Sequence, residues 1–189
     1  MDSRSDSEKG AAWAARAGCL HAGFSDRSVS ALEFREALAK VGSAVSVIST
    51  DGPAGTAGLT CSAMCAVSDT PPMVAVCVHR NSAANAAITA NGVLCVNCLQ
   101  ADQRDLSQMF AGVGRVAMRE RFTHGRWDTL VTGAPVCADA LVALDCEIID
   151  VREFGTHSMF IARVVATAHA GPADPLLYHQ RSYATTRSV

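Results

Sequence analysis

The stretch GLTCSAMCAVSDTPPMVAVCVH, residues 58–79, carries the strongest indication of the fold. Its first part, residues 58–68, follows a turn and predicts a returning strand. Pro71 and Pro72 cannot pair within a central strand because proline has no amide hydrogen, so they mark a bend. Residues 73–79 are apolar almost throughout, which is typical of a strand buried on both faces.

Working outward toward the N-terminus, residues 44–50 alternate and are β-branched, which predicts another strand. Residues 51–55, DGPAG, predict the turn after it. Before them, Ser30 and Glu33 have the spacing of a capping box at the start of a helix over 31–41. The apolar face of that helix comprises Leu32, Phe34, Leu38 and Val41.

Working outward toward the C-terminus, Ser82 is a candidate cap for a helix over 83–90, which Asn91-Gly92 ends. A second helix is predicted over 102–111, an irregular stretch over 112–140, and strands over 93–99, 141–151, 158–170 and 175–186. These elements predict a mainly β protein, a closed or nearly closed barrel with helices at its rim. Residues 1–28 are predicted to be a flexible tail, and residues 29–189 one domain.

The composition excludes several classes of protein. The chain has 189 residues, of which 49% are hydrophobic and 18% charged, unlike a disordered chain. No apolar run approaches the ~20 residues of a membrane-spanning helix. The net charge of −2 gives no broad attraction for nucleic acid. The polar, acidic start does not resemble a secretory signal, so we expect a cytoplasmic protein with reduced thiols.

Three motifs suggest chemistry at first sight but favour structural interpretations. Cys95 and Cys98 form a CxxC, but no second pair exists to complete a zinc site, and both lie in a predicted strand. Buried packing is the favoured interpretation, with a disulfide, a metal or a thiol redox sensor as alternatives. The GxGxxA at 112–117 follows a helical pattern rather than a strand, so it is not a dinucleotide fingerprint. Asp145 and Glu147 could form a catalytic carboxylate pair, but solvated or ion-paired charges are favoured.

Two features suggest a binding site. Small residues and hydroxyls crowd the segment 55–82, and small side chains let a flat ring approach backbone amides. Hydroxyls, one arginine and the helix start after Ser82 suit a phosphate. An ordinary strand–turn–strand unit with a capped helix is the alternative. His157 follows a turn and could be a polar group at a pocket mouth or a plain surface imidazole.

Taken together, the motifs resemble the flavin reductase-like family, the short-chain reductase components of two-component flavin monooxygenases. The resemblance rests on residues 58–88, 94–99, 110–112, 118–122, 155–164 and 175–183, and it spans about Leu32 to Tyr183. The DGPAG turn and the W-x-x-x-x-T-G spacing from Trp127 to Gly133 favour the pyrimidine-degradation subgroup over the para-hydroxyphenylacetate subgroup. Cys61 departs from the alanine that many relatives have.

The resemblance implies an FMN-binding split barrel that takes a hydride from NADH or NADPH onto N5 of FMN or FAD. It also implies a homodimer whose reduced flavin leaves for a separate monooxygenase. His157 would lie on the nicotinamide side as the catalytic residue. The implied flavin-binding residues are Gly58, Leu59, Thr60, Cys61, Ser62, Ala63, Arg80, Asn81, Ser82, Phe110, Arg181 and Tyr183. No metal site is expected.

Other functions stay open at this point. The same barrel could supply reduced flavin to a halogenase or for corrin reduction, or it could bind flavin without turnover. The sequence does not distinguish FMN from FAD or NADH from NADPH. It also does not decide whether the flavin is a bound cofactor or a passing substrate.

Overall fold

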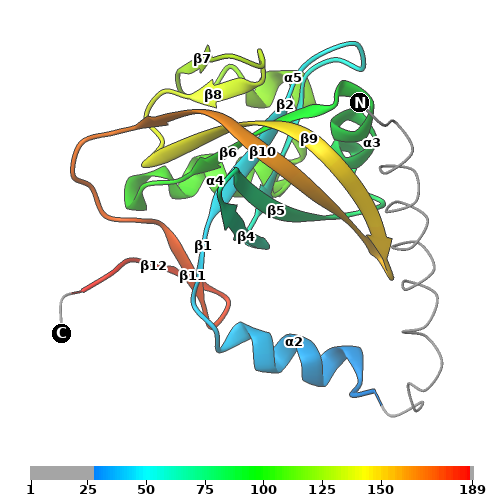
Figure 1. Cartoon of the computed structure of the whole chain (residues 1–189). Helices are drawn as coiled ribbons and strands as arrows, with labels where there is room; N and C mark the ends of the chain where they lie inside the picture. Colours follow the sequence, from blue (N-terminus) through cyan, green and yellow to red (C-terminus); the bar gives the residue numbers. More distant parts are fainter. Residues whose placement is uncertain (1–27, 188–189) are drawn as a thin grey trace, which may run out of the picture. The chain divides into compact units, whose positions relative to one another are not determined.

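The computed structural model describes residues 28–187 (Figure 1). They belong to two compact units, residues 1–38 and residues 39–189. The predicted tail, residues 1–28, lies outside the described residues except for Ser28. The domain start at residue 29 therefore stays a prediction.

The first described element is helix α2, Ala31–Ala39, which matches the helix predicted over 31–41. It begins with the predicted capping box. The amide of Glu33 donates to Ser30 Oγ at 3.2 Å, and the amide of Ser30 donates to Glu33 Oε2 at 2.8 Å. The apolar side chains of this helix are more than half exposed: Leu32, Phe34 and Leu38.

A seven-stranded antiparallel sheet forms the centre of the larger unit. The strands are β2 (Ser46–Thr50), β3 (Ala57–Cys61), β4 (Met64–Asp69), β5 (Pro72–His79), β6 (Val93–Cys98), β9 (Val142–Phe154) and β10 (His157–His169). Their spatial order is β3-β2-β6-β9-β10-β5-β4. The long strands β9 and β10 lie side by side and curve together (Figure 1). Fully buried Ile48, Val76, Leu94 and Phe160, from four different strands of this sheet, belong to the main hydrophobic core.

The two edges of this sheet are consecutive in the chain, and this forces the sheet to curl. Only Ser62 and Ala63 separate β3 from β4, and three Cα steps reach at most ~11 Å. Six strand spacings in a flat sheet would put the two edges roughly 28 Å apart. The edges therefore approach each other, and the Ala63 carbonyl accepts the Cys77 amide of β5 at 2.9 Å.

The result is a split rather than a closed barrel. In the part of the chain that the structure describes, β3 pairs with β2 and β4 pairs with β5, but β3 and β4 do not pair with each other. The prediction of a mainly β split barrel is confirmed. The prediction of one strand over 58–68 is wrong, because the chain changes sheet edge at Ser62–Ala63 without a glycine or proline to mark the change.

A smaller sheet contains β1 (Ser43–Ala44), β11 (Leu177–His179) and β12 (Ser182–Ala184) in the order β1-β11-β12. The single strand predicted over 175–186 is thus a hairpin. Its turn residues Gln180 and Arg181 have φ values of 48° and 61°. Such a turn usually contains glycine or asparagine, so the sequence carried no signal for it.

Helices α3 and α4 match the predictions over 83–90 and 102–111, although one cap differs, and α5 was not predicted. The helices are α3 (Ala83–Asn91), α4 (Arg104–Phe110) and α5 (Met118–Arg121), with 3₁₀ turns η2 (Ala101–Gln103) and η3 (Val113–Arg115). Gly92 ends α3 with a φ of 71°. The Ser82 hydroxyl makes no capping bond; the Ser82 carbonyl accepts the Asn85 amide at 3.0 Å instead.

The stretch predicted to be irregular, residues 112–140, holds more order than expected. It contains η3, α5 and a short hairpin of β7 (Trp127–Thr129) and β8 (Pro135–Cys137). The GxGxxA motif lies between α4 and α5, so no strand precedes it, as the sequence indicated.

Candidate functional site

The edge strand β3 faces a set of adjoining hollows in the larger unit. The Gly58 amide points away from β2 and lies 3.3 Å from Met118 Sδ. Because amides alternate along an antiparallel strand, the Thr60 amide points to the same open side. Backbone donors of an edge strand are therefore available to a ligand at this side of the sheet.

Three hollows adjoin one another here, and we name each by one of its residues. The Arg121 hollow, about 310 Å³, is lined by Gly58, Leu59, Thr60, Ser82, Ala83, Phe110, Ala111, Gly112, Met118 and Arg121. The Thr60 hollow, about 210 Å³, is lined by Val45, Thr60, Ser62, Ser107, Ala111, Tyr178 and Tyr183. The Arg104 hollow, about 510 Å³, is lined by Arg104, Gln108, Ala111, Val113, Tyr178, Arg181, Ser182 and Tyr183.

The three hollows form one trough because neighbouring hollows share lining residues. Thr60 and Ala111 belong to both the Arg121 and the Thr60 hollow. Tyr178 and Tyr183 belong to both the Thr60 and the Arg104 hollow. Binding sites for small ligands usually occupy 300–1,000 Å³, so a trough of this extent suits ligands larger than a single ring.

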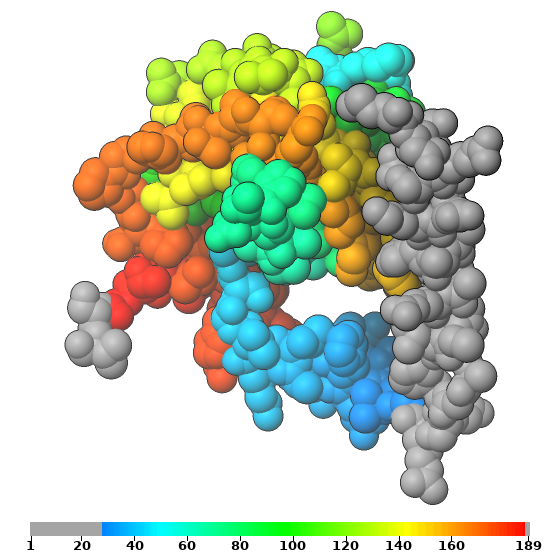
Figure 2. Space-filling model, in the orientation of Figure 1, coloured from blue at the N-terminus to red at the C-terminus, as the bar shows by residue number. Residues whose placement is uncertain are grey.

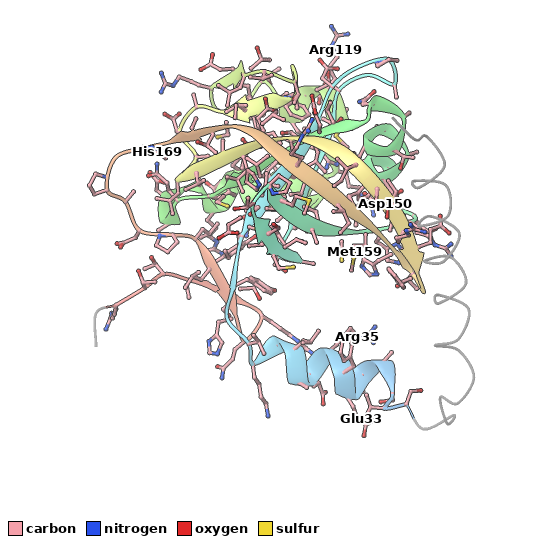
Figure 3. All side chains as sticks on the ribbon, in the orientation of Figure 1. Glu33, Arg35, Arg119, Asp150, Met159 and His169 are labelled. Carbon is pink, nitrogen blue, oxygen red and sulfur yellow. The ribbon has the colours of Figure 1, made fainter. Side chains whose placement is uncertain are left out.

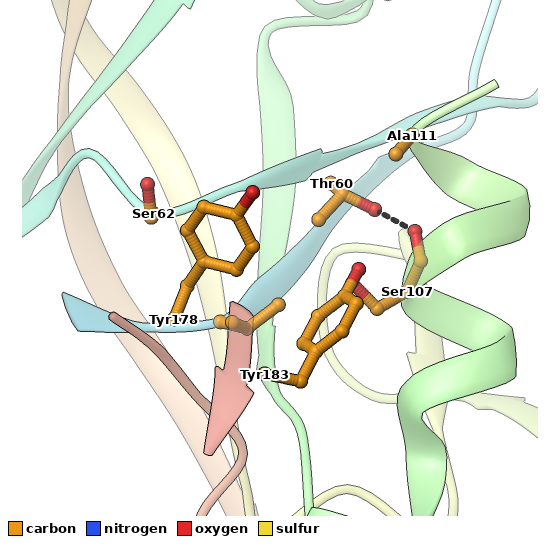
Figure 4. Close-up of a pocket in the computed structure, with 7 residues that line it drawn as sticks. Thr60, Ser62, Ser107, Ala111, Tyr178 and Tyr183 are labelled. Carbon is orange, nitrogen blue, oxygen red and sulfur yellow. Dashed lines mark hydrogen bonds between the residues drawn. The ribbon is translucent and has the colours of Figure 1, made fainter. Parts of the chain in front are cut away.

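A chain of hydrogen bonds fixes the middle of the trough (Figure 4). Thr60 Oγ1 donates to the Ser107 carbonyl at 2.6 Å, and Ser107 Oγ lies 2.9 Å from the Tyr183 hydroxyl. Strand β3, helix α4 and strand β12 are thereby tied together. The rings of Tyr178 and Tyr183 meet edge to face, 5.5 Å between centroids. They give the trough an aromatic wall.

Phe110 forms the floor of the Arg121 hollow and is held by other rings. Its centroid lies 5.0 Å from that of Phe122 and 5.5 Å from that of Trp127. A Cβ placed on Gly58 would come within 2.8 Å of Phe110 Cε1. Only glycine at position 58 allows β3 and this buried ring to lie so close.

Arg121 places a positive charge beside the β3 backbone. Its Nε donates to the Val116 carbonyl at 3.0 Å and its Nη1 to the Phe110 carbonyl at 3.4 Å. Within residues 28–187, no carboxylate oxygen lies within 4 Å of its guanidinium. The remaining N–H groups of this half-buried side chain are thus able to meet an anionic or carbonyl group of a ligand.

Residues 80–82, which follow β5, lie next to the trough, and Ser82 is the one among them that lines it. Arg80 is exposed and pairs with Glu153 at 2.7 Å. The Asn81 amide donates to His79 Nδ1 at 3.1 Å. Ser82 follows at once and lines the Arg121 hollow. The predicted phosphate residues therefore lie at one end of the trough, but Arg80 and Asn81 do not line it.

His157 is the first residue of β10 and lies beside His79, at the end of β5. Its ring meets that of His79 edge to face at 5.1 Å, and its Nδ1 lies 2.9 Å from Thr156 Oγ1. It lines none of the three hollows. The strand register connects His157 to Ser62, which lines the trough. Met159, two residues after His157, pairs with Cys77 of β5, and the Cys77 amide donates to the carbonyl of Ala63, which follows Ser62.

The structure thus brings most of the predicted residues together. Gly58, Leu59, Thr60, Ser62, Ser82, Phe110, Arg181 and Tyr183 line the trough. Cys61 is turned inward, with its Sγ 3.6 Å from the Cys77 carbonyl, and Ala63 lies at the sheet edge. The roles of all these residues remain predictions.

Sequence reasoning did not single out several lining residues. Among them are Arg104, Ser107, Ala111, Tyr178 and Arg121. Arg121 lies in the MRERF segment and Tyr178 in the PLLYH segment that carried the family resemblance, so a signal existed for those two. Arg104 lies on a helix whose approach to β12 depends on long-range packing, for which the sequence has no local signal.

The carboxylates Asp145 and Glu147 and the cysteines Cys95 and Cys98 have structural surroundings, as the sequence favoured. Glu147 pairs with Arg163 at 2.5 Å, and buried Asp145 accepts the Thr132 amide at 2.8 Å together with the Thr132 hydroxyl. The two carboxylates therefore do not act as a pair. Cys95 and Cys98 point to opposite faces of β6 because they are three residues apart. Among the described residues, no group of three His, Cys, Asp or Glu side chains is placed to hold a metal.

Buried thiols give a prediction about alkaline stability. Burial raises the pKa of Cys146 to about 12, and it also raises the pKa values of Cys61, Cys95 and Cys137. Above the ordinary pKa near 9 the unfolded thiol ionises while the native one stays protonated. The contribution of Cys146 to stability is therefore full below pH 9 and is lost between pH 9 and 12, by about 1.4 kcal/mol per pH unit.

Urea unfolding at pH 8, 9 and 10 measures this effect. Cys146→Ala should give a shallower fall with pH than the wild type, by the contribution of one thiol. Cys65→Ala is the matched control because Cys65 is exposed, and its slope should equal that of the wild type. Equal slopes for all three proteins would contradict the prediction. High pKa values also make these buried thiols poor redox sensors.

The fold and the trough together describe a small split-barrel protein whose edge strand β3 borders a trough of ligand size. A family model described as the flavin reductase like domain matches residues 38–187. The chain belongs to this family. The resemblance inferred from the sequence motifs is therefore confirmed.

Several known proteins are similar to this chain in sequence or in structure. An FMN reductase (NADH), RutF 2, of Methylorubrum extorquens strain PA1 is 51% identical over 156 residues, 82% of this chain and 90% of that protein. A Haemophilus somnus 129PT protein crystallised as a candidate flavin reductase is 38% identical, with a TM-score of 0.80 over 84% of this chain and all of that one. A homologue of nitrilotriacetate monooxygenase component B from Mycobacterium thermoresistibile is 26% identical, with a TM-score of 0.75 over 82% of this chain and 86% of that one.

Membrane insertion through a helix has no support in the described residues, since no helix there is both long and apolar enough to span a bilayer.

Proposed function

We propose that this chain is an NAD(P)H-dependent flavin reductase that acts on FMN, with FAD as the alternative flavin. The observation that carries the proposal is the trough beside β3, in which Gly58 lets the backbone and Phe110 form a close floor. The family membership and the named activity of the M. extorquens relative support it. The nicotinamide would give a hydride to flavin N5, and a proton from water would complete the reduced flavin.

The residues of this chain would act by binding and orientation. The Gly58–Thr60 backbone would lie against the flat ring, with the Thr60 amide as a donor to its polar edge. Arg121 would face the electron-rich part of the ring system and stabilise negative charge that develops there. Ser82 and the first amides of the nine-residue helix α3 would receive the flavin phosphate. Positioning two rings in contact supplies most of the catalysis that hydride transfer requires.

A kinetic assay tests the proposal directly. The pure protein is mixed with NADH or NADPH and with FMN, FAD or riboflavin, and oxidation of the nicotinamide is followed. We expect oxidation that depends on added flavin and is fastest with NADH and FMN. Binding of FMN without oxidation of either nicotinamide would instead indicate a flavin-binding protein without turnover. The absence of both would contradict the proposal.

His157 gives a specific prediction within this function. We propose that its imidazole orients the carboxamide of the nicotinamide. Loss of one such hydrogen bond costs about 0.5–1.5 kcal/mol, so His157→Ala should raise the KM for NADH or lower kcat by about 2- to 10-fold. The dissociation constant of FMN, measured by fluorescence quenching, should stay within twofold of the wild-type value.

The matched control is His169→Ala, at the other end of the same strand (Figure 3). It should leave both parameters unchanged. Unchanged steady-state kinetics for His157→Ala would remove the proposed role.

We also propose a homodimer that hands reduced flavin to a separate monooxygenase in the cytoplasm. Apolar side chains support the first part: Ile149 and Phe154 of β9 are 53% and 60% exposed, and Val67 of β4 is 48% exposed. Segment 157–169 of β10 lies along the molecular face shown in Figure 2 (orange). The name of the M. thermoresistibile relative supports the transfer of reduced flavin to a monooxygenase.

Light scattering tests the homodimer. It should give twice the mass of the chain, and a single-chain mass would contradict the dimer.

A further inference from the structure

The Arg104 hollow is a cationic pocket at the end of the trough away from Ser82, and it includes Arg181 and Tyr183, for which the family resemblance implied flavin contacts. Arg104 of α4 and Arg181 of the β11–β12 turn both line it, with Gln108 and Ser182 as further polar groups. None of its lining residues is acidic. Within residues 28–187, neither guanidinium has a carboxylate oxygen within 4 Å. Two unpaired arginines around one hollow form a binding site for an anion with several oxygens.

An aromatic contact holds the Arg104 side chain, and the turn conformation places Arg181 beside the hollow. The Arg104 guanidinium carbon lies 5.5 Å from the centre of the Tyr183 ring, a cation–π contact. The Tyr183 hydroxyl is in turn fixed by Ser107. Arg181 has a φ of 61°, an unusual conformation for a residue that is not glycine. The tight turn thus presents Arg181 beside the hollow instead of the glycine that such turns favour.

The position of this pocket along the trough indicates which ligand it takes. The flavin, in the proposed function, has its phosphate at Ser82 and its ring beside Thr60. The Arg104 hollow lies beyond Thr60, past Tyr178 and Tyr183. A second ligand whose ring meets the flavin near Thr60 would extend its charged part into this hollow. A nicotinamide dinucleotide has such a charged part, because a pyrophosphate joins its two nucleosides.

We propose that Arg104 and Arg181 bind the pyrophosphate of the reduced nicotinamide dinucleotide. This inference rests on the proposed function for the identity of the second substrate. The exposed face of Tyr178, which is 39% exposed, offers a surface on which the adenine can stack. The pocket would thus set a preference for donors that carry phosphate groups over donors that carry none.

Kinetics with two donors separate this role from a general effect on the fold. Arg104→Gln and Arg181→Gln should each raise the KM for NADH by about 3- to 10-fold, since each removes a charge-assisted contact at a partly exposed site. Reduced nicotinamide riboside carries no phosphate at all, so its kcat/KM should change less than twofold. Arg104→Lys should recover part of the loss. Arg119→Gln, an equal change of charge outside the hollow, should match the wild type (Figure 3).

Binding without turnover makes the inference independent of the enzyme assay. Calorimetry with ADP-ribose, which has the pyrophosphate but no nicotinamide, should show binding to the wild type and a loss of at least about tenfold in the double variant. FMN affinity should change less than twofold, a result that would replace the flavin contact implied for Arg181 by a contact to the dinucleotide. Weaker FMN binding with an unchanged KM for NADH would assign the arginines to the flavin phosphate and overturn the inference. ADP-ribose binding that is equal in all variants would also overturn it. If no flavin supports NADH oxidation, the proposed function fails, and ADP-ribose binding still tests the pocket.

Discussion

Gly58→Ala is expected to abolish most of the FMN affinity of this protein. The new Cβ would lie 2.8 Å from Phe110 Cε1 and 3.0 Å from the Ile48 carbonyl, closer than such atoms normally approach. Phe110 is 2% exposed and packs against Phe122 and Trp127, so it has no free space to enter. Overpacking of this kind costs about 1–3 kcal/mol, which corresponds to roughly 5- to 150-fold in affinity if it falls on the bound state.

A second substitution separates the steric cause from a general loss of structure. Phe110→Leu in the Gly58→Ala background removes the ring atoms that the new methyl group meets. The double variant should bind FMN more tightly than Gly58→Ala alone, which is a positive coupling in a double-mutant cycle. Gly171→Ala is the control for loss of a glycine, because a Cβ there meets nothing within 4 Å. Wild-type FMN affinity in Gly58→Ala would remove Gly58 from the site.

Position 58 also shows how far the sequence determined the candidate site. The small residues of segment 55–82 predicted a close approach to the backbone, and Gly58, Thr60 and Ser62 of that segment do line the trough. The sequence could not show that the close neighbour of Gly58 is Phe110. That contact joins residues 52 positions apart, and it depends on how α4 packs against β3.

For the fold, the sequence predicted the positions of most strands and helices but not the path of the chain between the sheet edges. Alternation and turn residues located the hairpin β9–β10 and the helix α3 to within a few residues. They did not reveal that the chain crosses from one sheet edge to the other at Ser62–Ala63. Local pattern is the same for one long strand and for two strands on opposite edges, because both alternate with a period of two. Only the closure of the barrel decides between them.

The hairpin of β7 and β8 was missed for a related reason. Its strands have three residues each, and a buried side chain outside it supplies part of what holds it. Asn97 of β6 donates from Nδ2 to the Val47 carbonyl at 3.0 Å and to Ser49 Oγ at 2.9 Å. Its Oδ1 accepts the Cys137 amide of β8 at 2.7 Å. A buried asparagine within a strand gives no sign of which segment it will bind.

Asn97→Ala should therefore destabilise the protein and loosen the β7–β8 hairpin in particular. Asn97 is fully buried, so its removal leaves the Cys137 amide without an acceptor and opens a small cavity. An unsatisfied buried donor costs about 1–3 kcal/mol, and we expect a total loss of about 2–4 kcal/mol in the free energy of unfolding. Urea unfolding measures the loss, and hydrogen exchange at the Cys137 amide locates it.

The flavin site should respond to the same substitution although Asn97 does not line the trough. Trp127 of β7 packs against Phe110, so a loosened hairpin removes support from the floor of the Arg121 hollow. FMN affinity should fall, and Trp127 fluorescence in a Trp13→Phe background should shift before global unfolding. Thr123→Val, which removes one exposed hydrogen bond to the Glu120 carbonyl, is the control and should change stability by no more than about 0.5 kcal/mol. An Asn97→Ala protein with wild-type stability and a protected Cys137 amide would show that the hairpin is held by its apolar contacts alone.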